Sequence, residues 1–461
     1  MTLKIISAFR KYRASVLVIS MIFLAVFSAL AISMAALSMT NIQIASNFHS
    51  VNAALTSAQS GQDVLRYWFS NLLIASSTPP SQYLAAIVAT LQTNLAANGI
   101  SNITVQNDGA ISTVVLDSTE GRCFTGQIQV DSNDPNILLC SVTGYSNSIS
   151  RTITVGYRIR PYEFPIFNYG LATKGPVHFL GNPNVNGLNF NSEADIFIES
   201  NNSNLAMLVT GNSQFDGDIS IGNLSAKVDL IGSVHIGGEK GQTAMDNHVH
   251  LGAESPQFPV PITKQFQQYA TGPAIDSSTD LLSLGTTMTN ATIIAGTDPN
   301  FEKSIIIEGI LYIERPNIVT FENNVTLKGI IAADGDPNFA GPNNSITFLG
   351  NFSSTPVPSG AEFDALREEK GSSILTPAFS VTLAGNFSAL SGVMAVSGAH
   401  FSGNVSATAK GTIINYSEDP TVIEGNASLR FDRSDNIKVP AGFDLYRELE
   451  YDPSTYSEVS I

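Results

Sequence analysis

The chain contains few charged residues and only two cysteines. Charged side chains make up 13% of the 461 residues, and 39 acids against 23 bases give a formal charge of -16. A surface with this balance repels phosphates and anionic headgroups, which disfavours nucleic acid as a partner. The two cysteines, Cys123 and Cys140, are able to form a disulfide in an oxidising compartment, but the sequence does not require one. The length predicts two or more structural units.

Charge is missing altogether from a long N-terminal stretch. After the basic leader of residues 1–13, no Asp, Glu, Lys or Arg occurs between Arg13 and Asp63. Residues 14–39 form an apolar span of about 25 residues, enough to cross about 30 Å of hydrocarbon. Because bases precede the span, we expect the leader in the cytoplasm and the rest of the chain outside it. Small residues such as Ala29 and Ala31 also leave a cleaved export signal open.

Proline is missing between the span and Pro79, and apolar residues recur there at helical spacing. The pattern predicts that the membrane helix continues as one amphipathic helix to about residue 76. An export signal does not need such an extension, whereas an anchored helix that packs into an assembly does.

Residues 81–161 predict a small α+β head. A second helix is followed by short β-prone runs, which Asn-Asp-Gly, Glu-Gly and Asn-Asp-Pro-Asn turns separate. This spacing favours an antiparallel sheet after the helix.

From residue 165 to residue 461 we expect an all-β domain, a β-solenoid of right-handed type. "TIIAGTDPNF" at Thr292–Phe301 returns as "GIIAADGDPNF" at Gly329–Phe339. Glycine and asparagine tolerate the left-handed backbone of coil corners, and stacked asparagines can hydrogen-bond from coil to coil. A β-sandwich gives similar local signals, and the proline-rich residues 254–284 are expected outside the coils. The Gly-Asn pairs lie at Gly181, Gly211, Gly222, Gly350, Gly385, Gly403 and Gly425.

Two histidines and several carboxylates are the candidates for chemistry. His248 and His250 lie two residues apart near Asp246, so on a strand both imidazoles could share a metal ion. Carboxylate pairs could act as acid and base in a polysaccharide-active β-helix, but few bases surround them. The pairs are Asp216 with Asp218 and Glu193 with Asp195, and three further acids, Asp134, Asp298 and Asp336, begin Asp-Pro-Asn turns. We expect solvated turn acids here, and no catalytic, cofactor or metal site.

The N-terminal residues resemble the type IV pilus assembly PilX N-terminal family. "RASVLVISMIFLAVFSAL" is similar to the opening of its helix, and "NAALTSAQSGQDVLRYW" is similar to its small-residue motif, with Ala54, Ala58, Gln59 and Gly61 as the matching positions. The resemblance covers roughly residues 10–75. It implies that this helix assembles with other pilin-like subunits.

The same resemblance implies processing by a prepilin peptidase. The matching small residue is Ala14, so Ser15 would begin the mature chain, although the family prefers glycine at the first position. Ile19 stands where major pilins carry a glutamate that pairs with the terminal amine of a neighbour. Both departures favour a minor subunit.

The hypothesis from sequence is therefore a non-enzymatic minor pilin or pseudopilin-like protein of a bacterial inner membrane. It would cross the membrane once and carry its bulk in the periplasm or outside the cell. Its partners would be other pilin-like subunits and a surface or glycan ligand of the β domain. The alternatives are a membrane-anchored polysaccharide-active enzyme and a plain anchored surface protein.

Overall fold

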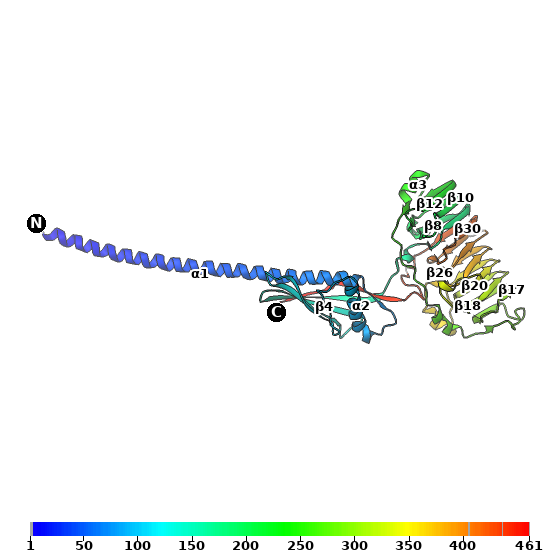
Figure 1. Ribbon diagram of the computed structural model, residues 1–461, viewed down its shortest axis with the longest axis horizontal. Coiled ribbons are helices and arrows are strands. Elements are labelled where there is room, and N and C mark those ends of the chain that lie inside the picture. The colour runs from blue at the N-terminus through cyan, green and yellow to red at the C-terminus, as the bar shows by residue number, and fades with distance from the viewer. Residues whose placement is uncertain (1–2, 404–405, 436, 461) are drawn as a thin grey trace. The chain divides into compact units, whose positions relative to one another are not determined.

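The computed structural model describes residues 3–403, 406–435 and 437–460, with side chains from residue 16 to residue 459. The chain divides into two compact units, and the second is inserted into the first. One unit comprises Met1–Arg160 together with Tyr446–Ile461, and the other comprises Pro161–Leu445. The predicted fold class is confirmed: a long helix with a small sheet, followed by an all-β domain of stacked parallel strands (Figure 1).

Helix α1 runs without interruption from Leu3 to Ser70. It ends earlier than the predicted residue 76, because Leu73–Ala75 form strand β1 instead. The partner of β1 lies far away in the sequence, so helical spacing alone could not show this change. Helix α2 follows at Tyr83–Ala97 and buries Ile87, Leu91 and its neighbours against the sheet.

The sheet of the N-terminal unit has the strand order β1-β32-β5-β4-β3-β2. Strands β2 to β5 pair antiparallel as consecutive neighbours, as the turn signals predicted. Apolar residues of α1, α2 and the sheet share one core, which includes Phe69, Ile87, Phe124 and Val142. The strands are β2 (Ala110–Asp117), β3 (Arg122–Val130), β4 (Ile137–Ser146) and β5 (Ile149–Pro161).

The final strand, β32 (Tyr446–Ser460), returns to this sheet and lies between β1 and β5. Leu73 pairs with Glu448 antiparallel, and Arg158 forms an ion pair with Asp452 at 2.9 Å. The predicted β domain of residues 165–461 is therefore wrong at its C-terminal end. A lone edge strand carries no sequence signal for which sheet it joins, because that depends on the partner's position in space.

The inserted unit begins with short strands that alternate with corners. Helix α3 (Gln242–His248) is the first α-helix of this unit. The strands up to this point are β6 (Leu171–Thr173), β7 (Val177–Gly181), β8 (Asn184–Gly187), β9 (Ile196–Ile198), β10 (Leu205–Phe215), β11 (Ile219–Ile221), β12 (Lys227–Ile236), β13 (Glu239–Lys240) and β14 (Val249–Leu251).

Residues 252–273 contain no strand, and a short 3-10 helix spans Thr263–Tyr269. The prediction that residues 254–284 lie outside the coils therefore holds only up to residue 273, because Ala274–Ile275 form β15, which pairs with β16. The coils resume after them. Their strands are β15 (Ala274–Ile275), β16 (Thr287–Ile293), β17 (Asn300–Phe301), β18 (Ile305–Ile313), β19 (Asn317–Phe321), β20 (Val325–Ala333), β21 (Asn344–Phe348), β22 (Phe352–Thr355), β23 (Ser372–Thr376), β24 (Ser380–Leu383), β25 (Phe387–Leu390), β26 (Val393–Val396), β27 (Ala399–Phe401), β28 (Ser406–Ala409), β29 (Ile413–Asn415), β30 (Thr421–Gly425) and β31 (Ser428–Phe431).

The coils do not stack in chain order. The last coil of the inserted unit pairs in parallel with its first coil, through β29 with β6, β30 with β7 and β31 with β8. The stack therefore runs from β16 through β30 and then from β7 to β12, and Figure 1 shows the orange β30 beside the green β8 and β10. Both connections to the other unit consequently leave from the middle of the stack rather than from its ends.

Side chains form ladders along the stack. Phe301, Phe321 and Phe348 occupy paired positions of three successive coils, with ring centroids 4.9 and 5.0 Å apart. The predicted asparagine ladder is confirmed at the Gly-Asn corners, where Asn182 donates to Asn426 at 3.0 Å. The backbone N–H of Asn212 in turn donates to the Asn182 side chain at 3.0 Å.

Candidate functional site

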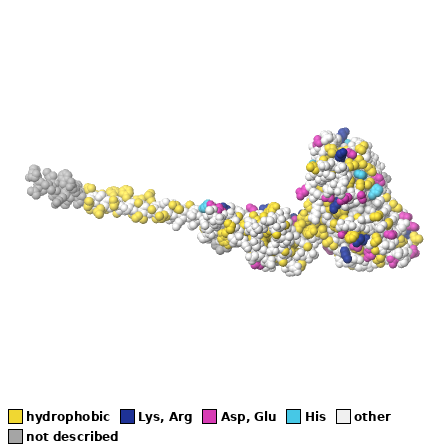
Figure 2. Space-filling view, in the orientation of Figure 1, with side chains coloured by type: hydrophobic (Ala, Val, Ile, Leu, Met, Phe, Trp, Pro, Cys, Tyr) yellow, Lys and Arg dark blue, Asp and Glu magenta, His cyan; other side chains and the backbone are white. Residues whose placement is uncertain are grey.

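The first half of α1 is an uncovered apolar surface, which we call the exposed segment, Val16–Phe48. Its large apolar side chains stay about half to three-quarters exposed, from Val16 at 64% to Phe48 at 66%. The helix is long and apolar enough to cross a membrane, and none of its most apolar stretch is buried. Figure 2 shows the yellow side chains on the part of α1 that the sheet does not cover.

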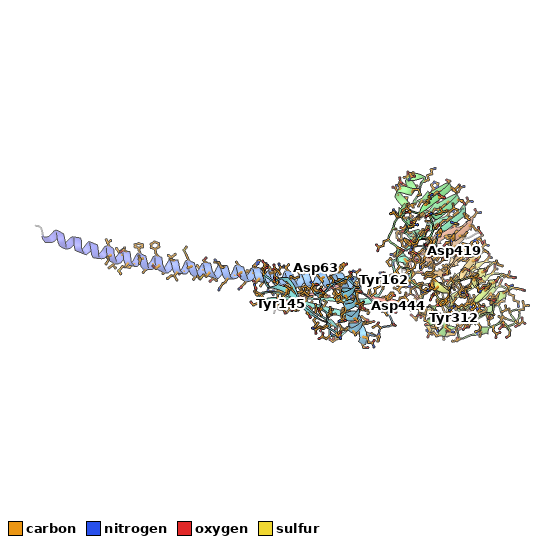
Figure 3. All side chains as sticks on the ribbon, in the orientation of Figure 1. Asp63, Tyr145, Tyr162, Tyr312, Asp419 and Asp444 are labelled. Atoms are coloured by element: carbon orange, nitrogen blue, oxygen red, sulfur yellow. The ribbon has the colours of Figure 1, made fainter. Side chains whose placement is uncertain are left out.

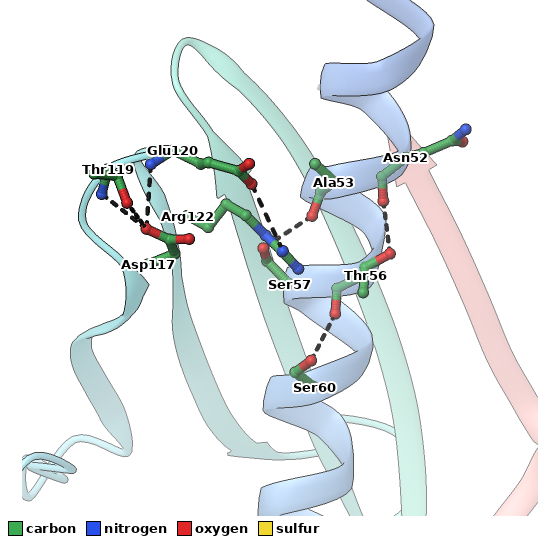
Figure 4. A network of polar contacts seen from close by, with 9 residues as sticks. All are labelled: Asn52, Ala53, Thr56, Ser57, Ser60, Asp117, Thr119, Glu120 and Arg122. Atoms are coloured by element: carbon green, nitrogen blue, oxygen red, sulfur yellow. Dashed lines mark hydrogen bonds and ion pairs between the residues drawn. The ribbon is translucent and has the colours of Figure 1, made fainter.

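Hydroxyl groups on this helix bond to its own carbonyl groups. Ser33 donates to the carbonyl oxygen of Ala29 and Thr40 to that of Ala36, each at 2.9 Å. Figure 4 shows the same pattern further along, where Thr56 donates to the carbonyl oxygen of Asn52. A hydroxyl satisfied in this way does not need water, so the segment tolerates an apolar environment of lipid or protein.

The second half of α1 packs against its own sheet, and small residues allow the close approach. Ala54 and Ala58 are fully buried. A Cβ atom on Gly144 of β4 would lie 2.2 Å from both the Ala54 oxygen and the Ala58 nitrogen. A Cβ on Gly61 would lie 2.7 Å from a methyl carbon of Val142. The predicted assembly residues Ala54, Ala58 and Gly61 therefore face the same chain.

Gln59 is exposed, as is Asp63 one turn further along the helix. Figure 3 labels Asp63 on α1. An assembly contact at Gln59 stays a prediction. Ala14 and Ser15 lie on α1 before the first residue whose side chain is described, so their processing also stays a prediction. Ile19 is 50% exposed within the exposed segment.

Cys123 and Cys140 do not form a disulfide; both thiols are free. The register of β3 and β4 pairs Cys123 with Tyr145 and Cys140 with Ile128, so the cysteines sit at separate places along the ladder. Five residues of strand separate them, about 17 Å, whereas a disulfide needs Cα atoms within about 7 Å. The disulfide left open by the sequence is thus excluded by register.

We expect Cys140 to resist alkylation in the folded protein. Burial raises the pKa of its thiol to about 12, so the reactive thiolate is scarce at about pH 8. Mass spectrometry after maleimide treatment should show Cys140 modified only once the chain is denatured. Part-exposed Cys123 is the internal control, and rapid native labelling of Cys140 would contradict the described core.

Both histidines contact the carboxylate of Asp218 rather than that of the nearby Asp246, and His248 Nε2 also lies 3.7 Å from Glu239 Oε2. His248 Nδ1 lies 2.7 Å from Asp218 Oδ1, and His250 Nε2 lies 3.3 Å from Asp218 Oδ2. Asp246 instead accepts a hydrogen bond from Gln242 within α3. Burial would raise the pKa of Asp218, but both imidazoles outweigh it and lower that pKa. Among the residues with described placement, no group of three or more His, Cys, Asp or Glu could hold a metal ion.

The candidate acids of the inserted unit are held by hydrogen bonds. Glu193 accepts from the backbone of Asn189, Phe190 and Arg433, and these bonds outweigh burial and lower its pKa. Burial raises the pKa of Asp195, which accepts from the Asp218 N–H at 2.9 Å.

Glu193, Asp195 and Arg433 line a groove of about 730 Å³. Asn189 also donates to Asp432 across the junction between β8 and β31. The sequence showed these acids but not the groove, because its lining comes from segments far apart in the chain, such as Phe190, Val393 and Arg433. Asp134 and Asp336 cap their own turns as predicted, through Asn136 and Asn338.

Comparisons with known proteins add little to this geometry. No family model matches the chain, and no curated protein matches it. Among solved structures, a competence-associated pilin, ComZ from Thermus thermophilus, is similar at 12% identity over 89% of this chain and 98% of that chain. Its TM-score of 0.25 is too low to support an argument about either fold or function.

Proposed function

We propose that the chain is a subunit of a type IV pilus or a related secretion filament, held in a bacterial inner membrane by α1 before assembly. The length of the exposed segment carries this proposal. About 20 helical residues cross the hydrocarbon of a bilayer. Lipid can therefore cover Val16 to about Met39, while Ile42, Ile44 and Phe48 lie beyond it and are 65%, 48% and 66% exposed. A helix of a neighbouring subunit would cover these side chains in a filament.

A minor rather than a major subunit is supported by the N-terminal residues. Ile19 offers no charge to a neighbour's terminal amine, and Ala14 replaces the glycine that the resemblance leads one to expect. The inserted solenoid is then the part displayed for adhesion or scaffolding. A non-enzymatic role is supported by the engagement of Glu193 and Asp218 with fixed neighbours.

We expect Phe48→Asp to lower the amount of this chain in filaments by at least about tenfold without unfolding the N-terminal unit. Phe48 is exposed in the isolated chain, so the substitution costs little there, but packing against another helix would bury the unpaired charge. The measurement is the amount of chain in a sheared filament fraction from cells that express it.

The matched control is Asn52→Asp, which puts the same charge on an exposed polar position one turn further along. The single tryptophan, Trp68, packs against the head core, so its fluorescence verifies folding of each variant. Equal incorporation of F48D and the unmodified chain would refute helix-mediated assembly. N-terminal mass spectrometry should show Ser15 at the mature terminus, and an intact Met1 would indicate a plain anchor.

A further inference from the structure

The two ends of the solenoid stack differ in how well their cores are closed. At the end formed by β15 and β16, the core residues Met288, Ala291 and Ile293 are at most 2% exposed. Leu281 and Leu284 of the preceding loop pack against the core there. This end is therefore covered by the chain itself.

At the other end, α3 closes only part of the terminal coil: Val234 and Ile236 of β12 are buried, and Met245 of α3 packs against the core. The first half of β12 is open. Val228 and Leu230 of β12 pair with Met207 and Val209 of β10, which are both fully buried. Val228 and Leu230 pack against the same core yet remain partly exposed. Leu251 of β14 is 41% exposed, whereas its partner Ile221 in β11 is fully buried. One more coil would bury these side chains as completely as those of the coil below.

The backbone of β12 is open along the same edge. Its inner edge pairs with β10 over the whole strand. Within the described ranges, β13 covers its outer edge only at His235 and Ile236. Residues 227–234 thus present a row of N–H and C=O groups that can template another strand. Ile231, in the middle of this row, is 58% exposed.

A column of glycines ends on this strand and restricts what can be added. A Cβ on Gly211 would lie 1.7 Å from the Gly181 oxygen, and one on Gly232 would lie 2.3 Å from the Gly211 oxygen. Each coil therefore needs a glycine at the position that stacks on the glycine of the preceding coil. A strand added in parallel onto β12 meets the same requirement opposite Gly232.

We propose that the outer edge of β12 binds an extended segment of another protein, which adds in parallel as one further strand. The segment would be apolar at the positions opposite Val228 and Leu230 and would carry glycine opposite Gly232. A second copy of this chain fits less well, because parallel addition needs a strand whose facing edge is free. At the opposite end of the stack, residues 272–275 already pair with β16 between Asn290 and Ile294, so among the described residues only Thr287–Thr289 of that edge lack a strand partner. This inference is independent of the filament role.

A peptide with the sequence of β10, Leu205–Phe215, is the direct probe, because β10 already pairs in parallel with β12. We expect the labelled peptide, with lysines appended for solubility, to bind the full chain in detergent micelles and raise the fluorescence anisotropy in a saturable way. A peptide with valine in place of the glycine at position 211 should show no saturable binding. Equal binding of both peptides would overturn the proposal, as would the absence of binding by either.

Variants of the chain test the location. Leu230→Lys should weaken peptide binding by at least about tenfold, because the added strand would bury the ammonium group. Ile318→Lys is the control, since Ile318 is 41% exposed and lies on β19, which is paired on both sides. Equal affinity of the two variants would place the peptide elsewhere. If L230K fails to fold, the comparison of the two peptides binding to the unmodified chain still tests the proposal. Self-association that L230K abolishes would identify a second copy as the occupant and overturn the proposal.

Discussion

Deletion of residues 446–461 is expected to unfold the N-terminal unit while the inserted solenoid keeps its structure. The deletion removes β32 from between β1 and β5, with buried Leu449 and the ion pair of Arg158 with Asp452. It also removes Tyr451, over whose ring the Arg66 guanidinium lies at 4.3 Å. A domain is stable by only about 5–15 kcal/mol, which the loss of two strand pairings should exceed.

Trp68 fluorescence measures this result, because the single tryptophan belongs to the N-terminal unit. The truncated chain should lose its cooperative fluorescence transition on heating, while far-UV circular dichroism still shows the β signal of the solenoid. Deletion of residues 457–461 alone is the control, since Ser457, Glu458 and Val459 are exposed. An unchanged transition after the full deletion would show that β32 does not complete the sheet.

Replacement of Gly211 by Ala is expected to lower the free energy of unfolding of the solenoid by about 4 kcal/mol or more. Two effects add at this position. Its φ of +88° disfavours any side chain, and the new Cβ would lie 1.7 Å from the Gly181 oxygen in the adjacent coil. The backbone at Gly211 cannot move away from this clash without breaking the pairing of β10 with its neighbouring strands.

Gly296→Ala separates these two effects. Gly296 has a φ of +71°, but a Cβ there meets nothing within 4 Å. The control should therefore cost only about 1–2 kcal/mol, the cost of left-handed backbone alone. Denaturant titrations followed by far-UV circular dichroism give both values. Similar losses for the two variants would show that the glycine column is not set by contact between coils.

The sequence predicted the parts of this structure that depend on local pattern. The uncharged span and the absence of proline predicted α1, and the Gly-Asn corners predicted both the solenoid and its asparagine ladder. The cysteine pair shows the limit of such reasoning. Whether two cysteines meet depends on strand register, and the register of β3 and β4 keeps Cys123 and Cys140 apart.

Small residues on α1 show a similar limit. Ala54, Ala58 and Gly61 predict close packing of a helix, but the pattern does not name the partner. The structure places all three against the sheet of their own chain, where Gly144 gives the helix room. The parts of α1 that this sheet leaves uncovered are instead the exposed segment and the face that carries Gln59.

The sequence by itself determined the long apolar helix, the antiparallel strands after it and the coil chemistry, because each follows from side chains close together in the chain. Only the tertiary structure decided that the solenoid is an insertion, that its first and last coils stack on each other, and that β12 is left with an open edge. These features arise from pairings between residues hundreds of positions apart, such as Leu73 with Glu448 and Val177 with Thr421. Short strands of similar composition can pair in many ways, and the closure of one shared core selects among them.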